Sequence, residues 1–344
     1  MYNGKKITII AVLEILNKYS DAGHRLSREK IVELLQSNYE IEVDKKLVTR
    51  DLMNLVLFED NKFDINYTEI PRAGNSPIRT DWYINHKFDS SELRLLIDSL
   101  LFSKHIPYSQ CKDLIKKLTS LSSEHFESHV KHVYALPENA PSNKAFFSII
   151  DMLDEAIQRR KQVLFNYADY GIDKKKQLRT GAGGAPIEYL VNPYQMVTAN
   201  GRYYLVGNLD KYDDIAHYRV DRIANLTIAE ESKAKPPEKV TGGMNLKQDL
   251  PKHMAEHIYM YSGEAVRVTF KADRRIMSDL VDWFGLDFSA IEIDDIFIEV
   301  TVKVNESAMF NWAMQYGAYV EVLSPESLRE KLTKTVSEMK AKYS

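Results

Sequence analysis

Arginine, histidine and tyrosine side chains gather in the segment before residue 223, where they could bind an anion. A strand predicted over residues 217–223 places His217, Arg219 and Asp221 on one face. Guanidinium groups pair with phosphates and aromatic rings stack on bases, so Arg219 with its neighbouring tyrosines suits an anion or a nucleotide. The alternative is that Asp221 only pairs with Arg219 or Arg222 on the surface of a barrel.

A second polar group lies on a helix predicted over residues 45–57. A helical wheel separates an apolar side (Val48, Leu52, Leu55, Val56) from a polar side (Lys46, Arg50, Met53, Asn54). A helix that reads DNA needs this division, because the apolar side holds the helix while Arg, Lys and Asn reach bases and phosphates. A solvated helix face is the alternative.

Histidines form the third group. His125, His129 and His132 could share one helix face as metal ligands. Without an acidic or cysteine fourth ligand, a solvated helix end is the better interpretation, and we expect neither a metal nor another cofactor. His253 and His257 do not form a zinc motif, and the glycines near residue 183 do not match a phosphate loop. With no pairing of nucleophile and base, we expect no enzyme.

Composition and charge narrow the class of protein. The 344 residues are enough for about two to three domains. The only cysteine, Cys111, cannot form a disulfide within the chain, which fits the cytoplasm. The longest apolar stretches, such as residues 7–16, fall short of the ~18 residues that span a bilayer, so we expect no membrane contact.

The net charge of −3 hides two opposed segments. Residues 1–70 hold ten Lys or Arg and twelve Asp or Glu, whereas residues 156–223 hold eleven and seven. The positive charge therefore lies outside the segment that carries the predicted DNA-reading helix.

The N-terminal periodicity predicts three short helices over residues 4–19, 28–38 and 45–57, with Ser27 and Asp44 as N-caps. Strands over 63–70 and 81–85 follow, with a turn-rich loop between them. This order is typical of a winged helix-turn-helix domain. Arg72 and Arg79 flank the turn and could contact phosphate or the minor groove.

Residues 88–145 are predicted to be helical, beginning with a capping box at Asp89 and Glu92, and to form a spacer or a dimerisation element. A helix over 146–160 then precedes short strands over 163–167, 189–198, 203–208, 217–223 and 226–229. Residues 173–186 are expected to be a mobile loop. Such strands with tight turns suggest a small SH3-like or Sm-like β-barrel.

The C-terminal segment follows a linker near residues 233–243. Its patterns predict the order βαββαβ from residue 265 to 323, with Asn305 as a helix cap, and then a final helix with Pro325 at its first position. This order is ferredoxin-like. A helix near residues 250–257 is only weakly patterned.

Two motifs carry a resemblance to a known family. The run GRYYLVG at 201–207 and the run YRVDRI at 218–223 resemble those of WYL-domain transcriptional regulators, with Tyr203-Tyr204-Leu205 in place of Trp-Tyr-Leu. Residues 191–194 (VNPY) match the family's strand with its proline, and residues 312–328 look like its C-terminal extension domain. Val48-Thr49-Arg50-Asp51-Leu52 resembles the core of its recognition helix.

The resemblance implies a bacterial, ligand-responsive DNA-binding regulator, usually a homodimer, whose barrel senses a negatively charged effector such as a nucleic acid or nucleotide. The residues that it implies for the ligand are Tyr194, Arg202, Tyr204, His217, Arg219 and Arg222. Those expected to contact double-stranded DNA are Lys45, Lys46, Thr49, Arg50, Asn54, Arg72 and Arg79. The alternative is an accessory factor, for example in phage defence, that binds single-stranded nucleic acid without reading an operator.

The expected fold is therefore a multidomain α+β chain. We predict a winged helix-turn-helix domain over residues 1–86, a helical spacer over 87–145, a WYL β-barrel over 146–235 and a ferredoxin-like extension domain over 260–344.

Overall fold

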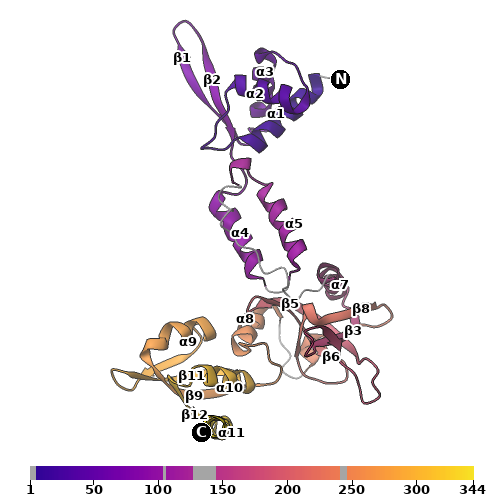
Figure 1. Cartoon of the computed structure of the whole chain (residues 1–344), viewed down its shortest axis with the longest axis vertical. Helices are drawn as coiled ribbons and strands as arrows, with labels where there is room; N and C mark the ends of the chain where they lie inside the picture. Colours follow the sequence, from indigo (N-terminus) through magenta and orange to yellow (C-terminus); the bar gives the residue numbers. More distant parts are fainter. Residues whose placement is uncertain (1–4, 104–105, 127–144, 241–245) are drawn as a thin grey trace. The chain divides into compact units, whose positions relative to one another are not determined.

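The computed structural model describes residues 5–103, 106–126, 145–240 and 246–344 (Figure 1). The chain divides into two compact units, residues 1–141 and 142–344. Both combine helices with β-strands, so the chain is a multidomain α+β protein, as predicted. Within the described ranges, no helix is long and apolar enough to cross a membrane.

The first unit begins with the three predicted helices, α1 (Lys5–Tyr19), α2 (Arg28–Tyr39) and α3 (Lys45–Leu57). The side chains of Ser27 and Asp44 cap α2 and α3 by accepting hydrogen bonds from the backbone N–H groups of Lys30 and Leu47. The helices pack around a core that includes Leu16, Leu35, Leu52 and Trp82.

A hairpin of β1 (Ile65–Arg72) and β2 (Asn75–Ile84) follows α3. The predicted loop and the predicted start of the second strand at residue 81 are wrong, because the strands continue to a tight turn at Gly74, which has φ +71°. Pro71 and Pro77 are tolerated within these strands since the sheet has two strands and each has an outer edge.

The helical segment consists of α4 (Ser90–Phe102), α5 (Tyr108–Thr119) and a short 3₁₀ turn, η1 (Glu124–Phe126). The capping box of Asp89 and Glu92 is present. Leu93, Ile97 and Phe126 form the small core of this segment.

The second unit begins with α7 (Phe146–Gln158) and six strands: β3 (Gln162–Tyr170), β4 (Lys176–Leu178), β5 (Glu188–Ala199), β6 (Arg202–Leu209), β7 (Ala216–Arg219) and β8 (Ile223–Ala229). They form one antiparallel sheet with the order β4-β3-β5-β6-β7, and β8 pairs with β3. The strand β3 therefore pairs with three others, so the sheet curls on itself.

Two sequence predictions for this sheet are wrong. The expected loop over 173–186 contains β4, which pairs with β3. The expected strand over 217–223 is interrupted by a 3₁₀ turn, η2 (Val220–Arg222), and its alternation of faces fails because Val220 and Asp221 are both buried.

After η3 (Pro237–Lys239) and α8 (Leu246–Glu256), the chain forms β9 (Ala265–Asp273), η4 (Arg274–Ile276), α9 (Met277–Phe284), β10 (Ser289–Glu292), β11 (Phe297–Asn305), α10 (Glu306–Gln315), β12 (Val320–Ser324) and α11 (Glu326–Tyr343). The strand order is β10-β11-β9-β12. Asn305 caps α10 as predicted, whereas Pro325 is the N-cap of α11 rather than its first residue. Phe270, Phe284 and Trp312 fill the core.

Candidate functional sites

Four cations, Lys176, Arg202, Arg219 and Arg222, lie close to the buried residues Tyr204 and Asp221 and form what we call the arginine cluster. The guanidinium of Arg219 donates two hydrogen bonds to this carboxylate, at 2.7 and 3.0 Å. The ammonium of Lys176 donates to the backbone carbonyl oxygen of Asp221 at 2.7 Å. This pairing of Arg219 and Asp221 is the alternative that the sequence left open. The turn η2 makes this pairing possible, because it brings the side chain of Asp221 next to that of Arg219.

Electrostatics in the arginine cluster favour a further anion. Burial opposes ionisation of Asp221, but the hydrogen bonds and charge of Arg219 outweigh it, and the pKa of Asp221 is lowered, with Lys176 and Arg202 contributing. Burial in turn lowers the pKa of Lys176. Three basic side chains, Arg219, Lys176 and Arg202, lie near this one buried carboxylate, so the local potential attracts negative charge.

Arg222 offers the least satisfied donor of the arginine cluster. One Nη of its guanidinium donates to Asp169 at 3.0 Å, and Asp169 also binds Arg179 at 2.7 Å. The Nε atom of Arg222 is buried and has no hydrogen-bond partner in the described part of the chain. Since an unpaired buried donor costs free energy, an oxygen of a ligand is the group that would satisfy it.

Tyrosines surround the arginine cluster. Tyr204 on β6 is in register with Arg219 on β7, and the backbone N–H of Arg219 donates to the hydroxyl of Tyr167 at 2.9 Å. Burial raises the pKa of Tyr204 against the nearby charges of Arg219 and Arg202, so this hydroxyl stays protonated at neutral pH. Tyr170 is also within electrostatic reach of Asp221.

Sequence reasoning missed Lys176, Tyr167 and Tyr170. Tyr167 and Tyr170 could have been considered, because they lie on or directly after the strand predicted before the glycine-rich segment. Lys176 belonged to a run of three lysines that suggested only a solvated loop.

Two of the predicted ligand residues lie elsewhere in the second unit. His217 belongs to a histidine cluster, in which its Nε2 lies 2.8 Å from Nε2 of His253 and the ring of His257 stacks on His253. Burial, with the neighbouring histidines, lowers the pKa of His217 to about 3. Among the described residues, no group of His, Cys, Asp or Glu is arranged to hold a metal ion. Tyr194 faces a separate cavity, near Glu238 and Asp210.

The predicted DNA-contacting residues of α3 form an exposed polar face. Lys46, Arg50 and Asn54 are exposed and follow one another at intervals of four residues, so they lie on one side of the helix. Arg50 also lies 3.6 Å from the buried Asp51. Lys45 is instead paired with Glu29 at 2.8 Å, and the hydroxyl of Thr49 donates to the carbonyl of Lys45 at 2.8 Å.

The two arginines of the hairpin differ in their surroundings. Arg79 donates to Glu69 at 2.8 Å and lies over the ring of Tyr67 at 5.4 Å, so it stabilises the hairpin itself. Arg72 is exposed beside the turn and makes no ion pair within the described ranges. Of the two, Arg72 is the one available to a phosphate.

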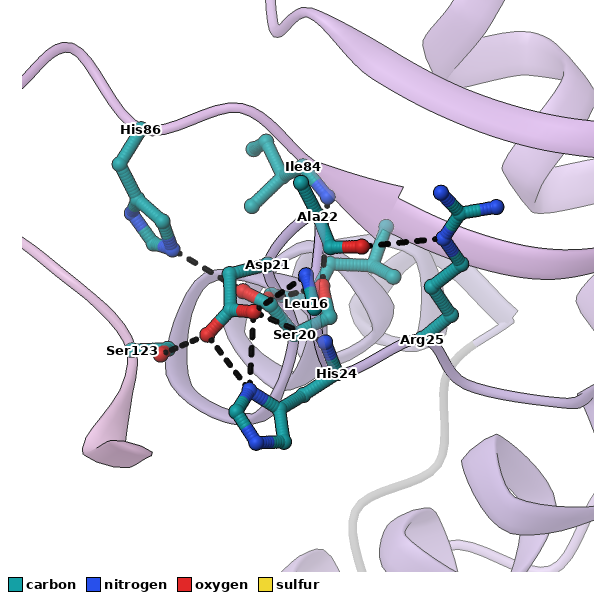
Figure 2. A network of polar contacts seen from close by, with 10 residues as sticks. Leu16, Ser20, Asp21, Ala22, His24, Arg25, Ile84, His86 and Ser123 are labelled. Atoms are coloured by element: carbon teal, nitrogen blue, oxygen red, sulfur yellow. Dashed lines mark hydrogen bonds and ion pairs between the residues drawn. The ribbon is translucent and has the colours of Figure 1, made fainter. Parts of the chain in front are cut away.

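A network of polar contacts within the first unit joins the end of α1, the end of β2 and the segment before η1 (Figure 2). The carboxylate of Asp21 accepts hydrogen bonds from the ring of His24 at 2.9 Å and from the hydroxyl of Ser123 at 2.6 Å. Ile84 N–H donates to Ser20 Oγ at 3.2 Å, while His86 Nε2 is 3.0 Å from the Ser20 carbonyl oxygen. The network therefore ties the segment before η1 to the end of α1.

The predicted three-histidine face near this network is only partly described. The ring of His125 stacks on His24 with centroids 3.6 Å apart. His129 and His132 lie outside the described residues, so the helix face shared by the three histidines stays a prediction.

Comparison with known families places two domains on the second unit. The family model of the WYL domain matches residues 148–228, and that of the WCX domain matches residues 264–340. The chain therefore contains a WYL domain followed by a WCX domain, and the resemblance seen in the sequence is confirmed for these two segments. No curated protein matches the sequence.

The solved structures that are similar to the chain include the following two. Proteasome accessory factor B/C (PafBC) of Arthrobacter aurescens is 14% identical with a TM-score of 0.29, over 95% of this chain and 47% of that chain. This chain thus spans about half the length of PafBC. A CRISPR Cas-related protein is 15% identical with a TM-score of 0.39, over 98% of this chain and 83% of that one.

Proposed function

We propose that this protein is a DNA-binding transcriptional regulator whose WYL domain senses a negatively charged effector, a nucleic acid or a nucleotide. The observation that carries the proposal is the arginine cluster in the WYL domain. There, Arg202 and Arg222 can add donors to an anion while Arg219 is held by Asp221. The role is binding rather than catalysis, and it needs no cofactor.

In this proposal, the first 86 residues form a winged helix-turn-helix domain that reads double-stranded DNA. Helix α3 packs its apolar side on α1 and α2 and leaves Lys46, Arg50 and Asn54 exposed, which supports its role in the major groove. The hairpin is the wing, with Arg72 near its turn as a phosphate contact.

We further propose a homodimer joined through α4. Leu95 and Phe102, seven residues apart on this helix, are 69% and 66% exposed. Apolar side chains that share a face and stay in water favour burial against a partner, and a second copy supplies the same surface.

Binding to the promoter region of its own operon tests the regulator proposal. Fluorescence anisotropy at physiological salt should give tighter binding to one duplex than to a shuffled duplex of equal length. Equal affinity for both duplexes would contradict it.

The second candidate is an accessory factor that binds single-stranded nucleic acid through the WYL domain without reading an operator. The observation that favours it is the charge of residues 1–70, where Asp and Glu outnumber Lys and Arg by twelve to ten. Affinity that rises with strand length, ignores duplex sequence and falls steeply with salt would support this candidate instead.

A further inference from the structure

A cavity of about 710 Å³ lies beside the WYL domain, and no residue of the arginine cluster lines it. Its walls come from the end of α7, the turn into β3, the middle of β5 and the segment after β8. This volume is within the usual range of small-molecule sites.

Backbone and side-chain hydrogen bonds hold the walls of this cavity together. The N–H of Ala234 donates to the carbonyl oxygen of Arg160 at 3.0 Å. The N–H of Lys235 donates to the side-chain oxygen of the fully buried Asn192 at 2.8 Å. The segment after β8 is thereby fixed to both the α7 turn and β5, so the cavity exists before any ligand enters.

Five cationic side chains and the one carboxylate of Glu238 line the cavity. Three of the cations already have acceptors: Arg159 contacts Glu155 and Glu230, Lys161 contacts the Glu230 carbonyl oxygen, and Lys235 contacts the Asp210 carbonyl oxygen. Arg160 and Lys233 are exposed and make no ion pair within the described ranges. They are the two cations available to a ligand.

Arg160 also has an unusual backbone. Its φ of +52° lies in the left-handed region, where a glycine would end a helix at lower cost. Despite this cost, Arg160 lines the cavity with a long cationic side chain.

Tyr194 supplies the donor inside the cavity. The residue is 5% exposed, and its hydroxyl is buried without a hydrogen-bond partner in the described part of the chain. Burial, with Glu238 and Asp210 nearby, raises the pKa of Tyr194 to about 12, so the hydroxyl keeps its proton and can donate it to an acceptor. Ile157, Pro193, Pro236 and Pro237 provide flat apolar walls beside it.

We propose that this cavity binds a small organic phosphate that carries a flat ring, of the size of a nucleoside monophosphate. The phosphate would pair with Arg160 and Lys233, because a guanidinium and an ammonium together match its two negative charges. The ring would lie against the proline walls. An oxygen of the ligand would accept a hydrogen bond from the hydroxyl of Tyr194. The site is distinct from the arginine cluster and does not depend on DNA binding.

Isothermal titration of the full chain with the four ribonucleoside 5′-monophosphates, and with inorganic phosphate, tests the proposal. At least one nucleotide should bind more tightly than phosphate. Arg160→Ala and Lys233→Ala should each weaken that binding about ten- to hundred-fold, the effect of removing a hydrogen bond to a charged group. Tyr194→Phe, which keeps the ring and its packing, should weaken it by a smaller factor.

A matched control separates a specific loss of binding from a general effect of charge. Lys175→Ala removes an exposed charge from the β3–β4 loop and should bind the nucleotide as the unaltered protein does. The proposal is overturned if none of the four nucleotides binds, if phosphate binds as tightly as they do, or if binding survives Arg160→Ala. It is also overturned if binding is lost entirely with Arg222→Ala, because the nucleotide would then occupy the arginine cluster of the proposed function. Failure of duplex binding would leave this result unaffected.

Discussion

Arg219 and Asp221 are joined by two hydrogen bonds across the turn η2, with the side chains 17% and 3% exposed. The guanidinium of Arg219 lies near Tyr204 and Tyr167, and Lys176 donates to the backbone carbonyl oxygen of Asp221. Arg219 therefore has a structural task as well as its place in the arginine cluster. A ligand that approaches meets Arg202 and Arg222 as the cations not held by Asp221.

Replacing Asp221 should destabilise the WYL domain. Asp221→Asn removes the charge but keeps the shape, and leaves the partly buried guanidinium of Arg219 without its counter-ion. We expect a loss of about 1–3 kcal/mol in the free energy of unfolding, measured by urea denaturation. The double variant Arg219→Gln/Asp221→Asn should lose less than the sum of the two single losses. Additive losses would show that the pair does not interact.

The histidine cluster should make stability depend on pH. The pKa of His217 is lowered to about 3 and that of His253 to about 4 in the folded protein, chiefly by burial, from a usual value of 6.5. The unfolded chain thus binds more protons in this range. Stability should be fully present above pH 6.5 and decline as the pH falls towards 4, by up to about 1.4 kcal/mol per pH unit for each histidine.

His217→Gln tests this dependence. The variant has one fewer histidine to protonate on unfolding, so its free energy of unfolding should decline less steeply over the same pH range. A decline as steep as in the unaltered protein would assign the pH dependence to other groups.

Arg50 should contribute to duplex binding. Arg50→Ala is expected to weaken binding to the preferred duplex by about 1–3 kcal/mol if its guanidinium reads a base. Anisotropy titration measures the change. The control Lys117→Ala removes an equal charge from an exposed position on α5 and should leave the affinity unchanged. Equal losses in the two variants would indicate only a general effect of charge.

The exposed face of α4 should carry the dimer contact. Leu95→Asp combined with Phe102→Asp should convert a dimer to a monomer, because two carboxylates would be buried in the interface. Light scattering after size exclusion measures the mass. Leu286→Asp, at a residue that is 87% exposed in the WCX domain, is the control and should remain dimeric. A dimer that survives the double change places the contact elsewhere.

Local signals in the sequence predicted much of the fold. Ser27, Asp44, Asp89 and Asn305 cap helices as predicted, because a cap is a contact between residues close in sequence. The break at Val220 was not predictable in this way. It depends on burying Asp221 against Lys176, which lies 45 residues away.

The candidate sites were harder to predict for the same reason. Arg202, Tyr204, Arg219 and Arg222 do come together around Asp221. Tyr194, which a motif grouped with them, packs in the same apolar cluster as Tyr204 but lines a cavity that none of these cations lines, at the point where β5 shifts register between Pro193 and Gln195. His217 is packed against α8, whose sequence gave only a weak helical signal. Membership of a family motif alone did not show which of these residues lie in the arginine cluster and which lie elsewhere.

The central claim is that an anion bound at the arginine cluster changes DNA binding. The most direct measurement is the affinity of the full chain for its preferred duplex with and without a short single-stranded oligonucleotide, compared between the unaltered protein and Arg222→Ala. We predict that the oligonucleotide changes duplex affinity at least about fivefold in the unaltered protein. Arg222→Ala should bind the duplex as tightly but show no change. A response of the same size in Arg222→Ala, or no response in the unaltered protein, would contradict the account.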